Sequence, residues 1–270
     1  MQSDTGYHFI ADFLSCQQKF FWRYIKGLVP KTQSKSLLFG DAIHKALAEY
    51  YNAKWINGSW AERESNSIFT FRESLENSER LYNYVEDLEN DISRGINLLN
   101  EYFIAYAHDP LASTAPEGIE AYKELSLKSG RVLTGNIDLI YDDKLYDHKT
   151  TGWSIPLAIR SLTMSNQSTT YLALTGKSAM VYNILYQKGR VCKFHREVIY
   201  RSQPAINRWL KQADEVLGKI SDMVGKPADD WWRNDRACFS YNHICEYVSL
   251  CQSGYNSHTC SGFKNAEVDK

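Results

Sequence analysis

The segment Gly135-Asn-Ile-Asp-Leu-Ile-Tyr-Asp-Asp-Lys-Leu-Tyr-Asp-His-Lys149 decides the predicted fold of this chain. It predicts two short strands joined by a turn at Tyr141-Asp-Asp-Lys144. Asp138 would lie near the end of the first strand. Asp147 and Lys149 are two residues apart, so they would share one face of the second strand. Two carboxylates and a lysine could therefore converge on one point.

These residue types suit metal-dependent phosphodiester hydrolysis. Carboxylate oxygens bind Mg²⁺ or Mn²⁺, which can deprotonate a water and stabilise a phosphorane-like transition state. The lysine would orient the nucleophile or neutralise developing charge. Taken alone, however, a D…DxK pattern fits an ordinary hairpin with exposed polar residues better, so further features must decide.

A histidine lies on a predicted helix upstream of this segment. The sequence Gly40-Asp-Ala-Ile-His44 runs into Lys45-Ala-Leu-Ala-Glu-Tyr-Tyr51, whose apolar spacing predicts a helix. His44 would lie on or beside the buried face, where a histidine is more often a core residue than a ligand. Downstream, Gln167 and Tyr171 are four residues apart and would share one side of a helix, a spacing that alone says almost nothing.

Cysteines near both ends of the chain form a second set of candidate ligands. Cys16 lies near the N-terminus, and Cys238, Cys245 and Cys251 form a C-x6-C-x5-C pattern near the C-terminus. Four thiolates could hold either Zn²⁺ or an iron–sulfur cluster, and the sequence does not separate these. Disulfides are less favoured, because the sequence starts without the features of a secretory signal.

Two other cysteines complete the set. Cys192 lies in a β-rich stretch and is predicted to be a buried small hydrophobe. Cys260 is either free or takes the place of Cys238 as a ligand.

The periodicity of the whole chain predicts one α/β domain over residues 1–270, 43% of which are hydrophobic. A mainly helical region, 1–110, would carry Cys16 and His44 and would include a long helical stretch over 59–107. A sheet core, 117–201, would carry three strands, a helix over 155–176 and two more strands. A helix and the cysteine-rich segment would follow in 202–270.

Charge and hydropathy bear on how the chain could bind DNA and on where in the cell it works. The net charge is −1, so any DNA path must be a local basic channel, with Arg160 among the candidates for its lining. No run of eighteen apolar residues exists to span a membrane. We therefore expect a cytoplasmic protein, in a bacterial cell or a phage-infected host.

Together these motifs resemble the RecB-like iron–sulfur branch of the PD-(D/E)XK nuclease superfamily, which includes the CRISPR-adaptation exonuclease and the AddB nuclease domain. The resemblance covers most of the chain and keeps the family's order: the Cys16 helix, a GxxxH ending at His44, a GxxD at Gly135–Asp138, the DxK, the QxxxY and the cysteine tail. It departs in having Asp147 where Glu is commoner, a histidine before Lys149 and a wider cysteine spacing.

The resemblance implies a restriction-endonuclease-like αβββαβ core, in which helices flank a mixed central sheet. It also implies a helical annex and a cysteine-ligated cluster joining the N- and C-terminal segments. Lys149 would be the catalytic lysine, and Gln167 and Tyr171 would position DNA or that lysine. Glu124 on the first strand would be either a site residue or a surface carboxylate. The implied ligands of Mg²⁺ or Mn²⁺ are His44, Asp138, Asp147 and the His148 backbone carbonyl.

The implied activity is metal-dependent DNA hydrolysis, with an exonuclease on single-stranded ends favoured. It would serve recombination, repair, or CRISPR or phage DNA processing, with a helicase, recombination or CRISPR-adaptation partner. Cys16, Cys238, Cys245 and Cys251 would hold a [4Fe–4S] cluster, with Zn²⁺ the less favoured occupant. The alternative is a non-catalytic cluster-containing module that binds DNA or scaffolds a helicase–nuclease or recombination complex.

Overall fold

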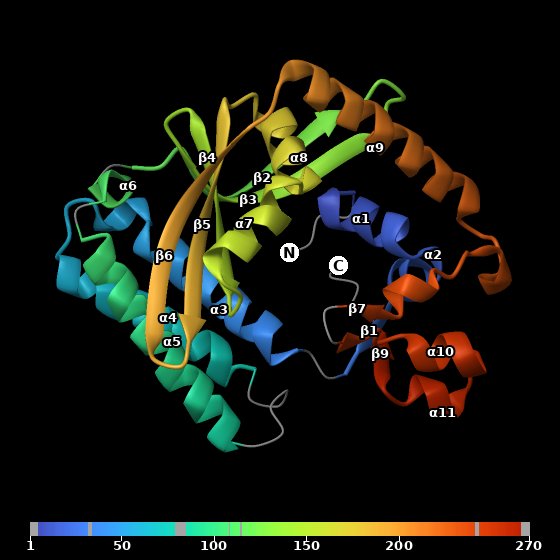
Figure 1. Cartoon of the computed structure of the whole chain (residues 1–270), viewed down its shortest axis with the longest axis horizontal. Helices are drawn as coiled ribbons and strands as arrows, with labels where there is room; N and C mark the ends of the chain where they lie inside the picture. Colours follow the sequence, from blue (N-terminus) through green and yellow to red (C-terminus); the bar gives the residue numbers. More distant parts are fainter. Residues whose placement is uncertain are drawn as a thin grey trace.

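A mixed five-stranded sheet forms the centre of the molecule (Figure 1). The computed structural model describes residues 5–31, 34–78, 85–107, 109–113, 115–240 and 243–265. Neighbouring strands in the sheet are antiparallel except for the parallel pair β4 and β5. The predicted restriction-endonuclease-like sheet flanked by helices is confirmed. In spatial order the strands are β2 (Gly118–Ser126), β3 (Val132–Tyr141), β4 (Lys144–Thr151), β5 (Ala179–Lys188) and β6 (Val191–Tyr200).

Two helices rather than one connect the parallel strands. The predicted helix over 155–176 is divided into α7 (Ile155–Thr163) and α8 (Asn166–Thr175). The division falls at Ser165, whose Oγ accepts a hydrogen bond from the backbone N–H of Gln167 at 3.2 Å. A serine in this position satisfies one of the N–H groups that a helix start leaves free. Residue 167 therefore lies in the first turn of its own helix.

One face of the sheet is covered by α3 (Lys35–Tyr50), α4 (Trp60–Glu76) and α5 (Val85–Ala105), with the short η2 (Ala53–Trp55) and α6 (Pro110–Ser113) beside them. These helices form the predicted annex, although residues 79–84 of the predicted 59–107 stretch lie outside the described residues. Close packing of α4 on α5 depends on Gly95, where an added Cβ would come within 1.9 Å of the Phe71 ring. Apolar side chains of β3, β4 and β5 complete this core.

The opposite face is covered by α7, α8, α9 (Gln203–Met223) and α1 (Tyr7–Ser15). α9 is tied to α8 by a buried hydrogen bond from Trp209 Nε1 to Thr170 Oγ1 at 2.8 Å. This layer fixes the helix that carries Gln167 and Tyr171.

The N- and C-terminal segments pack against each other, at the right of Figure 1. After α2 (Gln17–Phe20) and the π-helical turn η1 (Phe21–Ile25), β1 (Leu28–Pro30) pairs antiparallel with β9 (Phe263–Asn265). Trp231 is buried against the phenylalanines of this N-terminal segment, whereas Trp232 is 78% exposed. The other elements here are η4 (Ala228–Asp230), η5 (Asp235–Ala237), β7 (Phe239–Ser240), β8 (His243–Ile244), α10 (Val248–Ser253) and α11 (Ser257–Cys260).

Among the helices that the structure describes, none has the length and apolar character required to span a bilayer.

Candidate active site

The β3–β4 pairing ends where the candidate residues begin. Its register runs from Tyr141 opposite Lys144 to Leu139 opposite Tyr146. One residue further on, Asp138 Oδ2 accepts a hydrogen bond from the backbone N–H of His148 at 2.8 Å. A side-chain carboxylate thus takes the place of a ladder carbonyl. The two strands are held together at this point while one oxygen of the Asp138 carboxylate is left without a bond to β4.

Asp147 and Lys149 share the face of β4 that looks toward α8. Lys149 Nζ lies 2.6 Å from Asp147 Oδ2, and Gln167 Nε2 donates a hydrogen bond to Asp147 Oδ1 at 2.9 Å. Gln167 Nε2 also lies 3.4 Å from Tyr171 Oη. The Asp147 side chain is 2% exposed and that of Lys149 29%. Lys149 of the DxK motif and Gln167 of the QxxxY motif therefore both contact the Asp147 carboxylate.

Gly135 of the GxxD motif explains how α8 comes so close to β3. A Cβ at this position would lie 2.6 Å from Leu174 Cδ1 and 3.0 Å from Tyr171 Cε1. A side chain here would push α8, and Tyr171 with it, away from the strand.

His44 enters the site from α3, on the other side of the sheet edge. Its Nδ1 lies 3.0 Å from Asp138 Oδ2, and its side chain is 26% exposed. One turn earlier, Gly40 faces the end of β4, where an added Cβ would be 3.4 Å from Thr150 Oγ1. The GxxxH motif thus brings the helix against the strand that carries Asp147 and Lys149.

The electrostatics of His44 and Asp138 are those of an ion pair. Burial alone would lower the pKa of His44, but the Asp138 carboxylate outweighs it and raises that pKa to about 9. Burial would raise the pKa of Asp138, yet His44 holds it well below its usual range. In the metal-free protein at neutral pH, a protonated His44 therefore faces an ionised Asp138.

Lys149 is held as an ammonium ion. Burial favours its neutral form, but Asp147 and then Asp138 raise the pKa of Lys149 above its ordinary value. Burial raises the pKa of Asp147, and Lys149 opposes that shift. Lys149 can therefore donate hydrogen bonds and supply positive charge, but it is not poised to accept a proton at neutral pH.

Glu120, which no sequence motif predicted, lies in the site. His44, Glu120 and Asp138 each offer a ligand atom within 4.8 Å of the others, and within the described ranges they are the one set of three or more such groups. Glu120 takes a left-handed φ of 46° and accepts a hydrogen bond from Asn136 Nδ2 at 2.5 Å.

Glu124, the residue selected on this strand, is exposed and lies opposite Thr134. Antiparallel register could have identified Glu120 instead. The pairs Ile119–Leu139 and Ala121–Ile137 flank it and place it across from Asp138.

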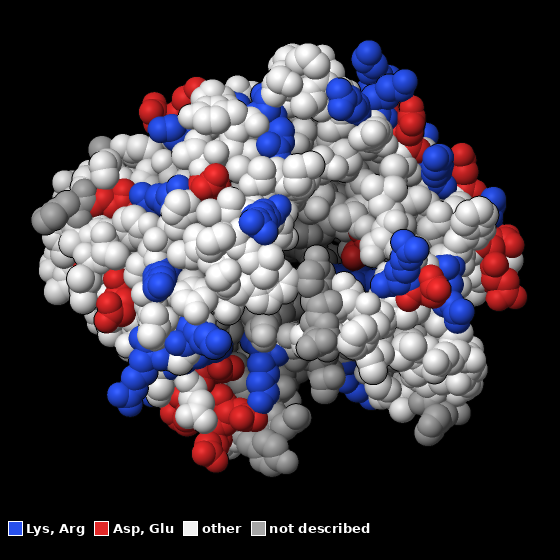
Figure 2. Space-filling view, viewed as in Figure 1, with Lys and Arg blue, Asp and Glu red and all other residues white. Residues whose placement is uncertain are grey.

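The site residues line one cavity of about 790 Å³: His44, Glu120, Asp138, Asp147, Lys149, Gln167 and Tyr171. His8 of α1 also lines it, and burial followed by the charge of Lys149 lowers the pKa of His8. Arg160 is exposed on α7 and is not among the described residues that line the cavity. Figure 2 shows a face hollowed near its centre, over which Lys and Arg side chains are interspersed with Asp and Glu rather than gathered in one patch.

The donor set fits a hard divalent cation. The carboxylates of Asp138 on β3 and Glu120 on β2, with the imidazole of His44 on α3, are ligands that Mg²⁺ and Mn²⁺ accept. Asp147 of β4, expected as a ligand, lines the same cavity but is not part of this group within 4.8 Å. At the centre of the set, Asp138 is already held by His148 and His44. The His148 ring contacts Tyr51 and Asn183 in the layer of α3 and α5, and its centroid lies 6.0 Å from that of the His44 ring.

The cysteines selected from the sequence come together where the terminal segments meet. Cys16 caps α2, is 6% exposed and accepts a hydrogen bond from the Asn234 backbone N–H at 3.4 Å. The Cys245 backbone N–H donates to the Cys238 carbonyl at 2.8 Å. Burial, opposed by Trp22, raises the pKa of Cys251, and the neighbouring Cys16 and Cys238 raise it further. Cys260, in α11, is half-buried against the same core.

The separation of these thiols bears on whether they could bind one ion. One Zn²⁺ with Zn–S bonds of about 2.3 Å needs thiolates about 4 Å apart. Within the described residues, no three cysteine Sγ atoms lie within 4.8 Å of one another. Within the described residues the thiols thus do not form a closed single-ion site.

The fold and this site define a class of metal-dependent nucleases. The chain belongs to the PD-(D/E)XK nuclease superfamily, whose family model matches residues 9–252. The crystal structure of a "Putative exonuclease" from Eubacterium rectale is similar, with a TM-score of 0.52 and 13% identity over 93% of each chain. At that identity the likeness shows the fold alone.

A second solved structure, of SSO0001, has a TM-score of 0.34 and 14% identity over 72% of this chain and 82% of its own. No curated protein matches the chain.

Proposed function

We propose that this chain is a single-domain DNA nuclease that hydrolyses phosphodiester bonds with a divalent metal ion and acts as an exonuclease on single-stranded ends. Superfamily membership supports hydrolytic nuclease activity with DNA as substrate. The preference for ends draws on the name of the Eubacterium rectale relative and on the RecB-like resemblance.

One observation carries the proposal: Asp138, Asp147 and Lys149 converge with His44 at one cavity. A structural ion-pair network does not need a lysine and two carboxylates, all largely buried, opening on the same cavity of about 790 Å³. Perturbed titratable groups that share a cleft favour a functional site.

In the proposed site, His44, Asp138 and Asp147 with the His148 backbone carbonyl hold Mg²⁺ or Mn²⁺. Glu120 offers a further carboxylate oxygen within 4.8 Å of ligand atoms of His44 and Asp138. A bound divalent ion supplies a water of lowered pKa and stabilises the charge of the transition state. Lys149, which remains an ammonium ion, orients that water or neutralises charge on the scissile phosphate. Gln167 and Tyr171 hold the Asp147–Lys149 pair in place.

We assign a structural [4Fe–4S] cluster to Cys16, Cys238, Cys245 and Cys251. These residues come from opposite ends of the chain, so a cluster would join α2 to the segment around α10 and close a long loop. Cys260 is the alternative to Cys238.

The test is incubation of the anaerobically purified protein with end-labelled linear single- and double-stranded DNA and with circular single-stranded DNA, each in Mn²⁺ and in EDTA. We expect Mn²⁺-dependent shortening of linear single strands, with circles left intact. Cleavage of circles would establish an endonuclease. If folded, cluster-loaded protein binds DNA without cutting any of these substrates, the non-catalytic binding or scaffolding module is supported instead.

A further inference from the structure

A row of polar side chains crosses the sheet on the face that α3 and α5 cover. His148 of β4 pairs with Asn183 of β5, and Asn183 pairs with Arg196 of β6. His148 is 2% and Asn183 0% exposed, and this face of the sheet is otherwise part of an apolar core. His148 and Asn183 are therefore buried, whereas the Arg196 side chain is 22% exposed. Buried polar groups need partners inside the protein.

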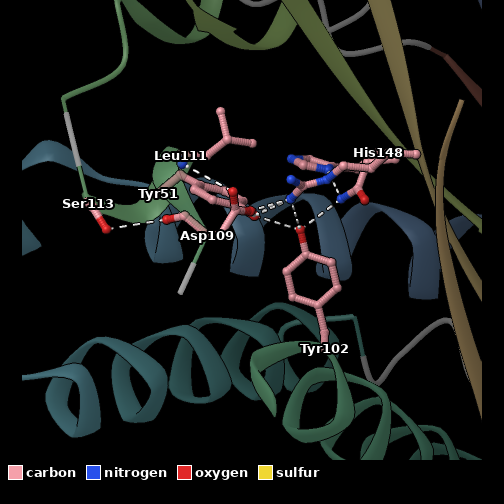
Figure 3. Close-up of polar contacts among 8 residues, drawn as sticks. Tyr51, Tyr102, Asp109, Leu111, Ser113 and His148 are labelled. Atoms are coloured by element: carbon pink, nitrogen blue, oxygen red, sulfur yellow. Dashed lines mark hydrogen bonds and ion pairs between the residues drawn. The ribbon is translucent and has the colours of Figure 1, made fainter. Parts of the chain in front are cut away.

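Two tyrosines and an aspartate of the helical layer supply partners for this row (Figure 3), although Asn183 Oδ1 and Arg196 Nε have none among the described residues. Asn183 Nδ2 lies 2.9 Å from His148 Nδ1 and 2.8 Å from Tyr102 Oη. Tyr102 Oη lies 2.6 Å from Tyr51 Oη, and Tyr51 donates to Asp109 Oδ2 at 3.2 Å.

Arg196 closes the network at its far end. Its guanidinium donates to both tyrosine hydroxyls, at 3.2 and 3.4 Å, and pairs with Asp109. The His148 ring also stacks on the Tyr51 ring, with centroids 5.9 Å apart.

The hydrogen bonds in this network run in one direction. Arginine has no acceptor, so Arg196, like Asn183 Nδ2, donates to Tyr102. Tyr102 must then donate to Tyr51, which donates to Asp109. Burial raises the pKa of both tyrosines, so both phenols keep their protons. The amide nitrogen of Asn183 can only donate, so His148 accepts from it at Nδ1.

Burying a helix on this face does not require the network. Tyr50, in the same layer, is fully buried, and its hydroxyl has no hydrogen-bond partner among the described residues. Apolar side chains of similar size would fill the layer without fixing any orientation. What the network adds is a defined position for the ring of His148.

His148 lies between the two residues that face the cavity. Its side chain is held by Asn183 and its backbone N–H by Asp138. The β3 ladder has already ended at Tyr146, so β4 has no regular pairing on that side here. β4 stays paired with β5 through Thr151, so the held His148 ring adds a constraint at the strand end that β3 has left. This constraint bears on the directions of Asp147 and Lys149 on the opposite face.

We infer that Tyr51, Tyr102 and Asn183 are positioning residues that hold His148, and through it the metal-binding end of β4, in register with Asp138. The inference rests on the proposed function, in which these strands bind the divalent ion. Partners that orient metal ligands typically change metal affinity about 10- to 100-fold when removed.

The test compares Tyr102→Phe with Tyr50→Phe. Each substitution removes one buried phenol oxygen from the same helical layer, but Tyr50 lies outside the network. Mn²⁺ binding is measured without DNA by electron paramagnetic resonance, and thermal melting and Mn²⁺-dependent cleavage are measured alongside. We expect about tenfold weaker Mn²⁺ binding for Tyr102→Phe and wild-type binding for Tyr50→Phe.

Wild-type Mn²⁺ binding by folded Tyr102→Phe protein would overturn the inference, even if its melting temperature fell, because the network would then be structural only. If Tyr102→Phe does not fold, Tyr51→Phe decides in the same way, since it breaks the chain while leaving the Arg196–Asp109 pair. The comparison does not depend on catalysis. A wild-type protein that binds Mn²⁺ but cuts no DNA refutes the nuclease proposal and leaves the tyrosine comparison decisive.

Discussion

Asp138 accepts the backbone N–H of His148 at 2.8 Å, at the point where the β3–β4 ladder ends. The Asp138 carboxylate thus accepts a structural hydrogen bond and is also proposed to bind the metal. The substitution Asp138→Asn tests the second role while keeping an oxygen for the first. The amide oxygen can still accept from His148, but the charge is lost. We expect a melting temperature close to wild type and cleavage reduced by about 100-fold or more. An Asp138→Asn protein that cuts at the wild-type rate would remove Asp138 from the metal site.

The pH dependence of metal binding follows from His44. Its pKa is raised to about 9 in the metal-free protein, and an imidazole must lose its added proton before it can bind a metal. Below pH 9 the ion must therefore displace a proton, so affinity should fall as pH falls, by up to about tenfold per unit. Calorimetric Mn²⁺ titrations at pH 7, 8 and 9 measure this slope. The slope should disappear in His44→Asn, and equal wild-type affinity at pH 7 and 9 would contradict a ligand role for His44.

Two glutamates on β2 offer a matched comparison. Glu120 lies beside His44 and Asp138, whereas Glu124 is exposed and opposite Thr134. We expect Glu120→Gln to weaken Mn²⁺ binding and to slow cleavage about tenfold, and Glu124→Gln to change neither. Cleavage titrated against Mn²⁺ concentration provides the readout. The reverse result would restore Glu124 as the acidic residue of this strand.

The cysteine assignment is tested by Cys245→Ala beside Cys192→Ala. Cys245 lies with Cys238 and Cys251 in the C-terminal segment. Cys192 lies on β6 instead, where its Sγ is 3.3 Å from Asn97 Nδ2. Anaerobically purified wild type should be brown, and Cys245→Ala should lose this absorbance and melt at a lower temperature. Cys192→Ala should keep both properties. If the wild type contained stoichiometric zinc and no iron, the four cysteines would be assigned to a zinc site instead of a cluster.

The sequence predicted those parts of the fold and site that depend on local periodicity. Asp147 and Lys149 share a strand face because they are two residues apart, and Gln167 and Tyr171 share a helix face because they are four apart. Both pairs meet at Asp147, as hydrogen bonds and the lysine contact show. Gly135 has a physical role that its motif did not state, because α8 packs directly on it.

Other features depend on tertiary contacts that leave no local pattern. The break between α7 and α8 rests on one capping serine, and the β1–β9 pair joins three-residue strands from opposite ends of the chain. Glu120 could be found only by aligning β2 with β3, since its left-handed φ has no sequence signal in a glutamate. The buried row of His148, Asn183 and Arg196 required knowledge that β4 and β5 are parallel neighbours.

The most direct test of the account is single-turnover cleavage of end-labelled single-stranded DNA in Mn²⁺ by Lys149→Ala, with Lys123→Ala as the control. Lys149 contacts Asp147 at 2.6 Å, whereas Lys123 is exposed on β2 of the same sheet. The account predicts that Lys149→Ala loses at least about 100-fold in rate while keeping its fold and DNA binding, and that Lys123→Ala cuts normally. Cleavage by Lys149→Ala at the wild-type rate would contradict the assignment of this site.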